Sequence, residues 1–347
     1  MAIKIPQEID DLIFKELNGI YSKGGNVDIA IDTDEFYKIY LGTYFPRSLC
    51  ESFLIFYDLY SNKVIANIFD NKQEINILDI GTGTGGNILG ICYFLKKIGY
   101  TKVKKINIYT IEQFANAIKY QKIFVDKFNE WYGLNVNLKH FEAKFDFPYK
   151  SDFETKFKQF NAHFNINFKF DIITTSKFIS EFYNRDYAQS QNLYSFFVDF
   201  FSKFLIKEGI LLLLDLVSKD IKSTHPRYKA EIMSQEINSY LKSNKSLEYI
   251  LPLSCAKWNK ECTTQHCYIE NIFTVQHSKR TSDVSKVTYR ILTDKEMADK
   301  ILSTAKLFDV FYVSHNPSRP KICKSGIITE RTDAFQFPDA FKINHNE

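Results

Sequence analysis

The residues with the clearest chemical meaning are three glycines that follow a short apolar run. The run Ile77–Ile80 leads into Gly81, Gly83 and Gly85, and an apolar helical pattern begins at Ile88. Glycine adopts left-handed backbone conformations and lets another molecule approach the main chain closely. A helix that opens after such a turn directs its free N–H groups at a ligand. The pattern therefore predicts a ligand site at this turn.

An acidic residue further along the chain strengthens this prediction. Glu112 ends the apolar run that begins at Ile108, and an acid at the tip of a second strand accepts hydrogen bonds from both hydroxyls of a ribose. The glycines follow the order G-x-G-x-G-G and are preceded by Asp79. Dinucleotide enzymes use G-x-G-x-x-G instead, so a nicotinamide enzyme is the weaker alternative.

The elements that must hold these residues alternate between strand and helix. This alternation predicts an α/β fold with a mainly parallel sheet and helices on both faces. The stretch 147–169 is either a surface insertion or a further helix. The expected strands are Ile75–Ile80, Lys105–Glu112, Val136–Glu142, Phe170–Thr175 and Gly209–Val217, and the expected helices are Ile88–Ile98, Ala115–Tyr132 and Leu193–Leu205.

The pattern changes at both ends of this alternating region, which predicts three parts. Residues 1–70 carry apolar residues at helical spacing and are expected to form a helical cap. Residues 71–220 form the core. Residues 221–347 are expected to complete the sheet, with a helix at 228–243, a Cys/His-rich insertion at 250–277 and a strand at Val287–Leu292.

Composition and charge narrow the class of protein. The chain has 347 residues, of which 45% are hydrophobic, and a net charge of +4, so it can bury a core and an anionic partner is permitted but not required. The N-terminus lacks the apolar stretch of a signal peptide. The longest apolar run, Gly209–Val217, is far shorter than the ~20 residues of a membrane helix. We expect a cytoplasmic protein.

Residues 74–217 resemble the class I S-adenosylmethionine-dependent methyltransferases, because of Asp79, the glycine turn and Glu112. The resemblance implies a Rossmann-like core with a seven-stranded sheet, S-adenosylmethionine as cofactor and methyl transfer as activity. A protein that binds the cofactor without turnover is an alternative, since fold does not fix function. The cofactor-binding residues that the resemblance implies are Asp79, Gly81, Thr82, Gly83, Gly85, Asn87, Glu112, Glu142, Ala143 and Ser176.

The residues after the fourth strand of the core bear on the acceptor. Thr175-Ser176-Lys177-Phe178 stands where the base-amine methyltransferases carry Asn/Asp-Pro-Pro-Tyr/Phe and the cytosine C5 enzymes carry Pro-Cys, so both chemistries are disfavoured. Lys177 and Glu181 either contact a substrate or are solvated helix charges. Asp215, at the end of the fifth strand, either faces the cleft or caps the next helix.

Three cysteines fall within thirteen residues near the C-terminal part. Cys255, Cys262 and Cys267, with Cys323 further downstream, are candidate ligands for zinc or for an iron–sulfur cluster, because thiolates suit both. The alternative is a set of buried free thiols, since no C-x₂-C pair is present.

A second resemblance joins this cysteine cluster to the core. The order of features is similar to that of the mitoribosomal small-subunit methyltransferase-like family, although Ala256-Lys257 replaces the Pro-His of that family. The similarity implies an iron–sulfur centre, and ribosomal RNA or an assembling small ribosomal subunit as the partner. A protein or small-molecule acceptor is the alternative. The family similarity also implies that phosphate is contacted by Lys279, Arg280, Lys286 and Arg290.

Overall fold

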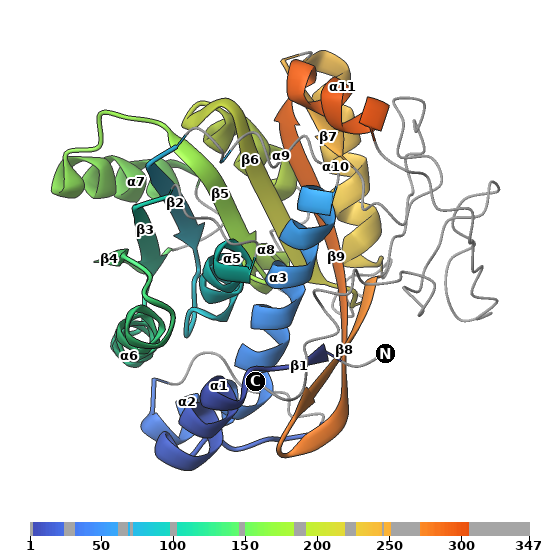
Figure 1. Ribbon diagram of the computed structural model, residues 1–347. Coiled ribbons are helices and arrows are strands. Elements are labelled where there is room, and N and C mark those ends of the chain that lie inside the picture. Colours follow the sequence, from blue (N-terminus) through green and yellow to red (C-terminus); the bar gives the residue numbers. More distant parts are fainter. Residues whose placement is uncertain are drawn as a thin grey trace, which may run out of the picture.

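The computed structural model describes residues 3–23, 32–61, 69, 72–97, 103–145, 150–183, 192–218, 227–244, 246–250 and 271–304. Over these residues nine strands form one sheet, in the order β1-β8-β9-β6-β5-β2-β3-β4, with β7 paired to β9 outside this path (Figure 1). The predicted α/β fold with a mainly parallel, Rossmann-like sheet is confirmed.

Five parallel strands form the centre and one edge of this sheet. The residues of β2, β3, β5 and β6 are mostly buried, as expected for strands that are covered on both faces, whereas those of the edge strand β4 are mostly half-buried. The register pairs Ile80 of β2 with Ile111 of β3 and with Thr175 of β5, so the carboxyl ends of these three strands lie side by side. The five strands are β2 (Glu74–Ile80), β3 (Lys105–Glu112), β4 (Val136–Glu142), β5 (Phe170–Ser176) and β6 (Leu205–Leu216).

Helices cover both faces and give the protein two apolar cores. One core joins the sheet to α3 (Phe45–Ser61), α5 (Gly86–Lys97), α6 (Ala115–Tyr132) and α11 (Lys295–Thr304). The other joins the opposite face to α7 (Lys150–Phe164), α8 (Ile179–Tyr183), α9 (Leu193–Ser202) and α10 (Lys229–Ser243). The stretch 147–169 therefore contains a helix, since Phe153, Phe157 and Phe160 are buried at helical spacing.

The N-terminal segment, which was expected to be helical, contains a short strand as well as helices where it is described. It comprises β1 (Ile3–Lys4), α1 (Gln7–Asp11), the π-helix η1 (Leu12–Glu16), α2 (Asp34–Thr43) and α3. Figure 1 shows α3 crossing the sheet beside α5. Glycine permits this close approach: a Cβ at Gly86 would lie 3.1 Å from the Cβ of Ser48, and one at Gly90 would lie 3.0 Å from that of Ser52.

The C-terminal part adds a long hairpin that the sequence only partly predicts. β8 (Asn271–His277) and β9 (Arg280–Asp294) are antiparallel, and β9 also pairs antiparallel with β6 and with β7 (Leu247–Ile250). β1 pairs in parallel with β8, with Ile3 opposite Val275. The sheet thus has nine strands over the described residues, where seven were expected.

Helix length and polarity bear on a membrane location. None of the helices in the described ranges is both long and apolar enough to cross a bilayer.

Candidate functional site

The glycine turn lies between β2 and α5, at the carboxyl edge of the sheet. Gly81, Gly83 and Gly85 have φ angles of 67°, 55° and 91°, a region that costs other residues roughly 1–2 kcal/mol each. The N–H of Gly81 donates to the carbonyl oxygen of Ile111 at 2.9 Å, which ties the turn to β3. The three glycines are therefore needed by the backbone itself.

Glu112 lies beside this turn at the end of β3. Its Oε2 accepts from the N–H of Gly83 at 2.7 Å, and its Oε1 accepts from the N–H groups of Gln113 at 2.8 Å and Phe114 at 3.2 Å. Burial raises the pKa of Glu112, although the three N–H groups oppose that shift. A carboxylate has about four acceptor positions, so one remains for a ligand hydroxyl.

Asp79 and Asn87 belong to a buried network beneath the turn. Asn87 Nδ2 donates to Asp79 Oδ1 at 3.2 Å and to Thr174 Oγ1 at 3.1 Å, and Ser52 Oγ donates to Asn87 Oδ1. Burial raises the pKa of Asp79 well above its usual value. These side chains connect α3, α5, β2 and β5. The structure thus places the predicted residues Asp79 and Asn87 beneath the glycine turn.

The other predicted cofactor residues lie around the same edge. Thr82 Oγ1 donates to the carbonyl oxygen of Asp79 at 3.1 Å, within the turn. Glu142 is exposed at the end of β4, and the N–H of Ala143 donates to the carbonyl oxygen of Glu112 at 2.9 Å. Ser176 ends β5 and is partly exposed. The structure thus gathers the predicted set at one edge, while their binding role stays a prediction.

Two aromatic rings pack against the turn: Tyr40, which sequence reasoning missed, and Phe178, which lies in the segment after β5 that the sequence singled out. A Cβ at Gly83 would lie 2.8 Å from the hydroxyl of Tyr40, and a Cβ at Gly81 would overlap the ring of Phe178. Burial, with the nearby charge of Glu112, raises the pKa of Tyr40, so its hydroxyl stays protonated and can donate. Tyr40 comes from α2, and no local motif connects it to the turn.

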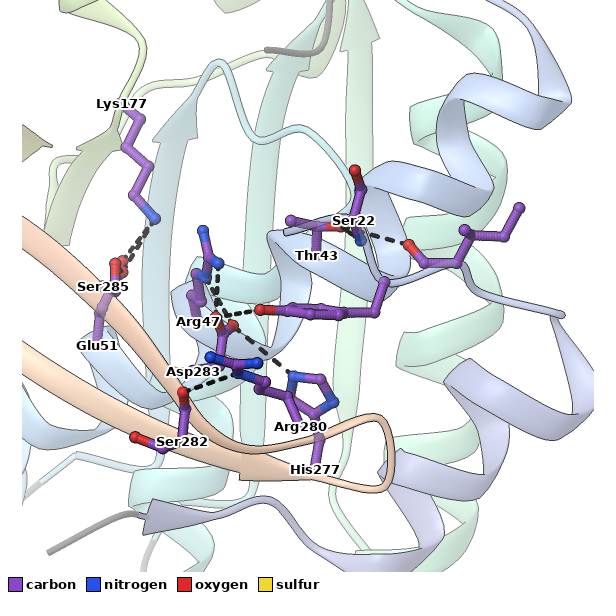
Figure 2. Close-up of polar contacts among 12 residues, drawn as sticks. Ser22, Thr43, Arg47, Glu51, Lys177, His277, Arg280, Ser282, Asp283 and Ser285 are labelled. Carbon is purple, nitrogen blue, oxygen red and sulfur yellow. Dashed lines mark hydrogen bonds and ion pairs between the residues drawn. The ribbon is translucent and has the colours of Figure 1, made fainter. Parts of the chain in front are cut away.

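Lys177 follows β5 directly and enters a buried ion pair. Its Nζ lies 2.8 Å from Oε2 of Glu51 and donates to Ser48 Oγ at 3.1 Å, both on α3. Glu51 is fully buried, and Ser285 Oγ of β9 donates to its Oε1. Figure 2 shows Lys177, Glu51 and Ser285 pointing toward one another.

Asp215 binds the N-terminal part of α8, a helix that precedes it in the chain, and not the next helix as one of the two alternatives predicted. Its Oδ2 accepts from the N–H of Ser180 in α8 and from the hydroxyl of Tyr194, both at 2.9 Å. The side chain is 1% exposed, and burial raises its pKa although the nearby Lys229 opposes that shift.

A second polar cluster joins the N-terminal segment to the β8–β9 hairpin (Figure 2). Arg47 of α3 donates two hydrogen bonds to Asp283, at 2.7 and 2.6 Å, and the Tyr21 hydroxyl donates a third at 3.0 Å. His277 Nε2 lies 3.7 Å from Asp283 Oδ2, too far for a hydrogen bond, and its ring stacks on Phe14. Although burial opposes ionisation, these neighbours hold the pKa of Asp283 below its usual range.

The predicted phosphate contact of Arg290 is wrong. Arg290 is 1% exposed, because its strand lies inside the sheet. Its guanidinium donates to Thr288 Oγ1 at 3.2 Å, to the carbonyl oxygen of Tyr289 at 2.8 Å and to Ser234 Oγ. Lys279 and Lys286 are exposed on the hairpin.

The predicted metal ligands Cys255, Cys262, Cys267 and Cys323 lie outside the described residues. Within the described ranges no group of three or more His, Cys, Asp or Glu side chains could hold a metal. Cys50 and Cys92 are buried free thiols.

Comparisons with known proteins give similarities in structure alone. No protein-family model matches the chain, and no curated protein matches it. A putative class I S-adenosylmethionine-dependent methyltransferase from Listeria monocytogenes is 8% identical, with 89% of this chain and 74% of that chain covered and a TM-score of 0.40. The plantazolicin methyltransferase BpumL in complex with SAH is 12% identical, with 83% and 94% covered and a TM-score of 0.39.

A third solved structure is a precorrin-6y C5,15-methyltransferase from Geobacter metallireducens. It is 12% identical, with 66% of this chain and 85% of that chain covered and a TM-score of 0.32. Structural similarity at these TM-scores does not indicate what this chain binds.

Proposed function

We propose that this protein binds S-adenosylmethionine and is an S-adenosylmethionine-dependent methyltransferase. The observation that carries the proposal is the pairing of the glycine turn with Glu112. The carboxylate lies 2.7 Å from the N–H of Gly83, at the edge of a parallel sheet where open α/β folds bind their ligands. A ribose at the free acceptor position of Glu112 would place the rest of the cofactor along the turn.

Buried polar atoms near the turn support a ligand there. Among the described side chains, Asp79 Oδ2, Thr84 Oγ1 and Thr175 Oγ1 are buried without a hydrogen-bond partner. Such atoms are rare in native proteins and point to a ligand or an ordered water. The rings of Tyr40 and Phe178 flank the same turn and would give an adenosine apolar surface to pack against.

The bound cofactor would supply a methyl group already activated on a sulfonium, so the task of the protein is to position the acceptor in line with it. Tyr40 and the α3 residues Ser48 and Glu51 cover this side of the turn. We therefore propose a small molecule or a peptide segment as the acceptor, because either can enter a covered site.

An RNA acceptor and a ribosomal partner stay predictions, as does the metal centre at Cys255, Cys262, Cys267 and Cys323. Burial of Arg290 removes one of the four expected phosphate contacts. Iron, zinc and sulfide analysis of anaerobically purified protein tests the metal centre. Titration of a structured RNA at rising salt tests the partner, because each phosphate contact contributes about one unit to the slope.

Calorimetric titration with S-adenosylmethionine, S-adenosylhomocysteine and NAD tests the function. We expect the two sulfur ligands to bind and NAD not to bind, and NAD binding alone would refute the proposal. Gly83→Val should abolish binding. Gly133→Val is the matched control, because Gly133 has a similar φ of 61° and a Cβ there would meet nothing within 4 Å. Equal loss of binding in both variants would mean that backbone strain alone is responsible.

A further inference from the structure

Three groups of Gly83 are already in contact with other residues. Its N–H donates to Glu112 Oε2 at 2.7 Å, and its carbonyl oxygen accepts from Gln121 Nε2 at 2.6 Å. The Tyr40 hydroxyl lies 2.8 Å from the place that a Cβ of Gly83 would take. The function proposed above puts the ligand on this side of Gly83, where glycine lets another molecule approach. A ligand there must therefore displace the ring of Tyr40.

The ring of Tyr40 has little that ties it to the turn. Its hydroxyl has no hydrogen-bond partner among the described residues. Its ring contacts are with Phe36, Tyr37 and Tyr44, which lie on α2 or directly after it. These contacts move with the helix, so withdrawing Tyr40 from Gly83 breaks no hydrogen bond and keeps its aromatic neighbours.

The C-terminal end of α2 is firmly anchored. A Cβ at Gly42 would overlap the backbone of Ile20, so the two segments are in direct contact. Thr43 Oγ1 accepts from the N–H of Ser22 at 3.0 Å and donates to the carbonyl oxygen of Ile20 at 3.3 Å. This end of the helix therefore provides a fixed point about which the rest of α2 can pivot.

The N-terminal end of α2 is held only by exposed polar contacts to α6. Asn116 Nδ2 donates to Asp32 Oδ1 and the Tyr120 hydroxyl donates to Asp34 Oδ1, both at 3.0 Å. Asp32 and Asp34 are exposed, so water competes for both bonds. Because α6 begins just after Glu112, this weakly held end lies over the acid that closes the site.

We propose that α2 is a lid over the glycine turn, that Tyr40 and S-adenosylmethionine compete for the same face of Gly83, and that α2 pivots near Gly42 to admit the ligand. This inference rests on the function proposed above. Opening separates Asp32 from α6 and withdraws Tyr40 from the turn. On closing, the ring packs against the bound ligand in place of Gly83. Lids of this kind sequester a reaction from water, and their opening sets the rate of exchange.

The association rate of S-adenosylhomocysteine, measured by stopped-flow fluorescence, tests the competition. Tyr40→Ala leaves the face of Gly83 open without any movement of α2. Its association rate should exceed that of the wild type by about tenfold or more, because a minor open state is typically ~0.1–10% populated. Tyr57→Ala is the matched control and should bind at the wild-type rate. Tyr57 is a half-buried tyrosine that lies about 13 Å further along α3 than Ser48.

A reversible cross-link tests whether α2 itself must move. Asp32→Cys/Asn116→Cys places two thiols where these side chains already meet, and a short bismethanethiosulfonate joins them until dithiothreitol cleaves it. The cross-linked protein should bind S-adenosylhomocysteine at least about tenfold more slowly, and cleavage should restore the rate, which rules out misfolding. The two single variants, treated in the same way, control for labelling of the native cysteines.

The outcomes separate this proposal from the one on which it rests. An unchanged association rate in Tyr40→Ala overturns the lid, and so does a cross-linked protein that binds at the wild-type rate, because the ligand then reaches the turn without displacing α2. If neither the wild type, nor Tyr40→Ala, nor the double variant before cross-linking binds an S-adenosyl ligand, the methyltransferase proposal itself is refuted.

Discussion

Whether the substitution Gly90→Ala stabilises or destabilises the protein depends on how closely the helices α3 and α5 approach each other. Gly90 lies inside α5, where replacing glycine by alanine ordinarily stabilises a helix by about 1 kcal/mol. Here the added Cβ would overlap the carbonyl oxygen of Leu49 and lie 3.0 Å from the Cβ of Ser52, both on α3. The obstacle includes backbone, which cannot rotate aside as a side chain can.

We expect the steric cost to exceed the gain in helix propensity. Overpacking of a dense interior costs about 1–3 kcal/mol, so Gly90→Ala should lower the free energy of unfolding by about 1–2 kcal/mol. The assay is urea unfolding followed by far-ultraviolet circular dichroism, with S-adenosylmethionine affinity measured in parallel. Because α3 also carries Ser48 and Glu51, its displacement should weaken ligand binding as well.

A stabilised Gly90→Ala variant would refute this reasoning. It would mean that α3 moves away from α5 at negligible cost, and that the contact does not fix the position of Ser48 relative to the glycine turn. Destabilisation with unchanged ligand affinity would mean that the close contact between α3 and α5 contributes to stability but not to ligand binding.

Three more predictions concern buried carboxyl groups. Glu112→Gln should weaken S-adenosylmethionine binding by about 1–3 kcal/mol in calorimetry, because a charged acceptor of the Gly83 N–H and of a ribose is lost; unchanged affinity would contradict the assigned site. The pKa of Asp79 is raised in the folded protein. The free energy of unfolding of the wild type should therefore fall relative to that of Asp79→Asn as pH rises above about 4, by at most ~1.4 kcal/mol per pH unit. Parallel curves of stability against pH for the two proteins would contradict this. The pKa of Asp283 is lowered, so its stabilisation is present above its ordinary pKa and is lost as pH falls toward the lowered value. Asp283→Asn should cost about 3 kcal/mol at pH 7 and remove that acid sensitivity, and a cost below 1 kcal/mol would mean that Arg47 finds another partner.

Periodicity predicted the core because its strands and helices are locally consistent. The bounds predicted for the strands Lys105–Glu112 and Val136–Glu142 and for the helix Ala115–Tyr132 agree with β3, β4 and α6. Each combines an apolar pattern of one period with a clear stop, such as Gly133 after α6, which ends the helix in a left-handed conformation at φ 61°. Element and turn chemistry agree here, so sequence reasoning succeeds.

The sequence predicted Val287–Leu292 within β9 but missed the rest of the hairpin, because polar residues alternate with apolar ones there. The first half of β9 has Asp283 and Ser285 buried and Val284 exposed, the reverse of the pattern that a strand on an apolar core presents. The buried carboxylate is explained only by Arg47, 236 positions away, and a single sequence gives no sign of that pairing. Arg290 was wrongly predicted to contact phosphate for a related reason. The sequence does not show which neutral acceptors allow its positive charge to lie inside the sheet.

The sequence predicted the part of the site that forms a local motif and missed the part that comes from distant segments of the chain. Glycines and an acid at the ends of neighbouring strands form a local motif, and their arrangement follows from parallel strand order. Tyr40 and Glu51 come from helices that precede the core, and only the packing of α2 and α3 brings them to the turn. Lys177 could be singled out by its position after β5, but its partner on α3 could not.

The pairing of β1 with β8 has a consequence for the order in which the chain folds. The N–H of Ser278 donates to Asp10 Oδ1 at 2.8 Å across 268 positions of sequence, one of the longest loops that this chain can close. At a synthesis rate of 5–20 residues per second, these partners are made on the order of 15–50 s apart. Strands β2 to β6 are complete well before that, so the apolar edge of β6 and the inner face of the first helices stay uncovered until the hairpin emerges. Contact order of this kind slows folding and exposes sheet edges to other chains, so a chain arrested before residue 271 should depend on chaperones far more than the finished protein does.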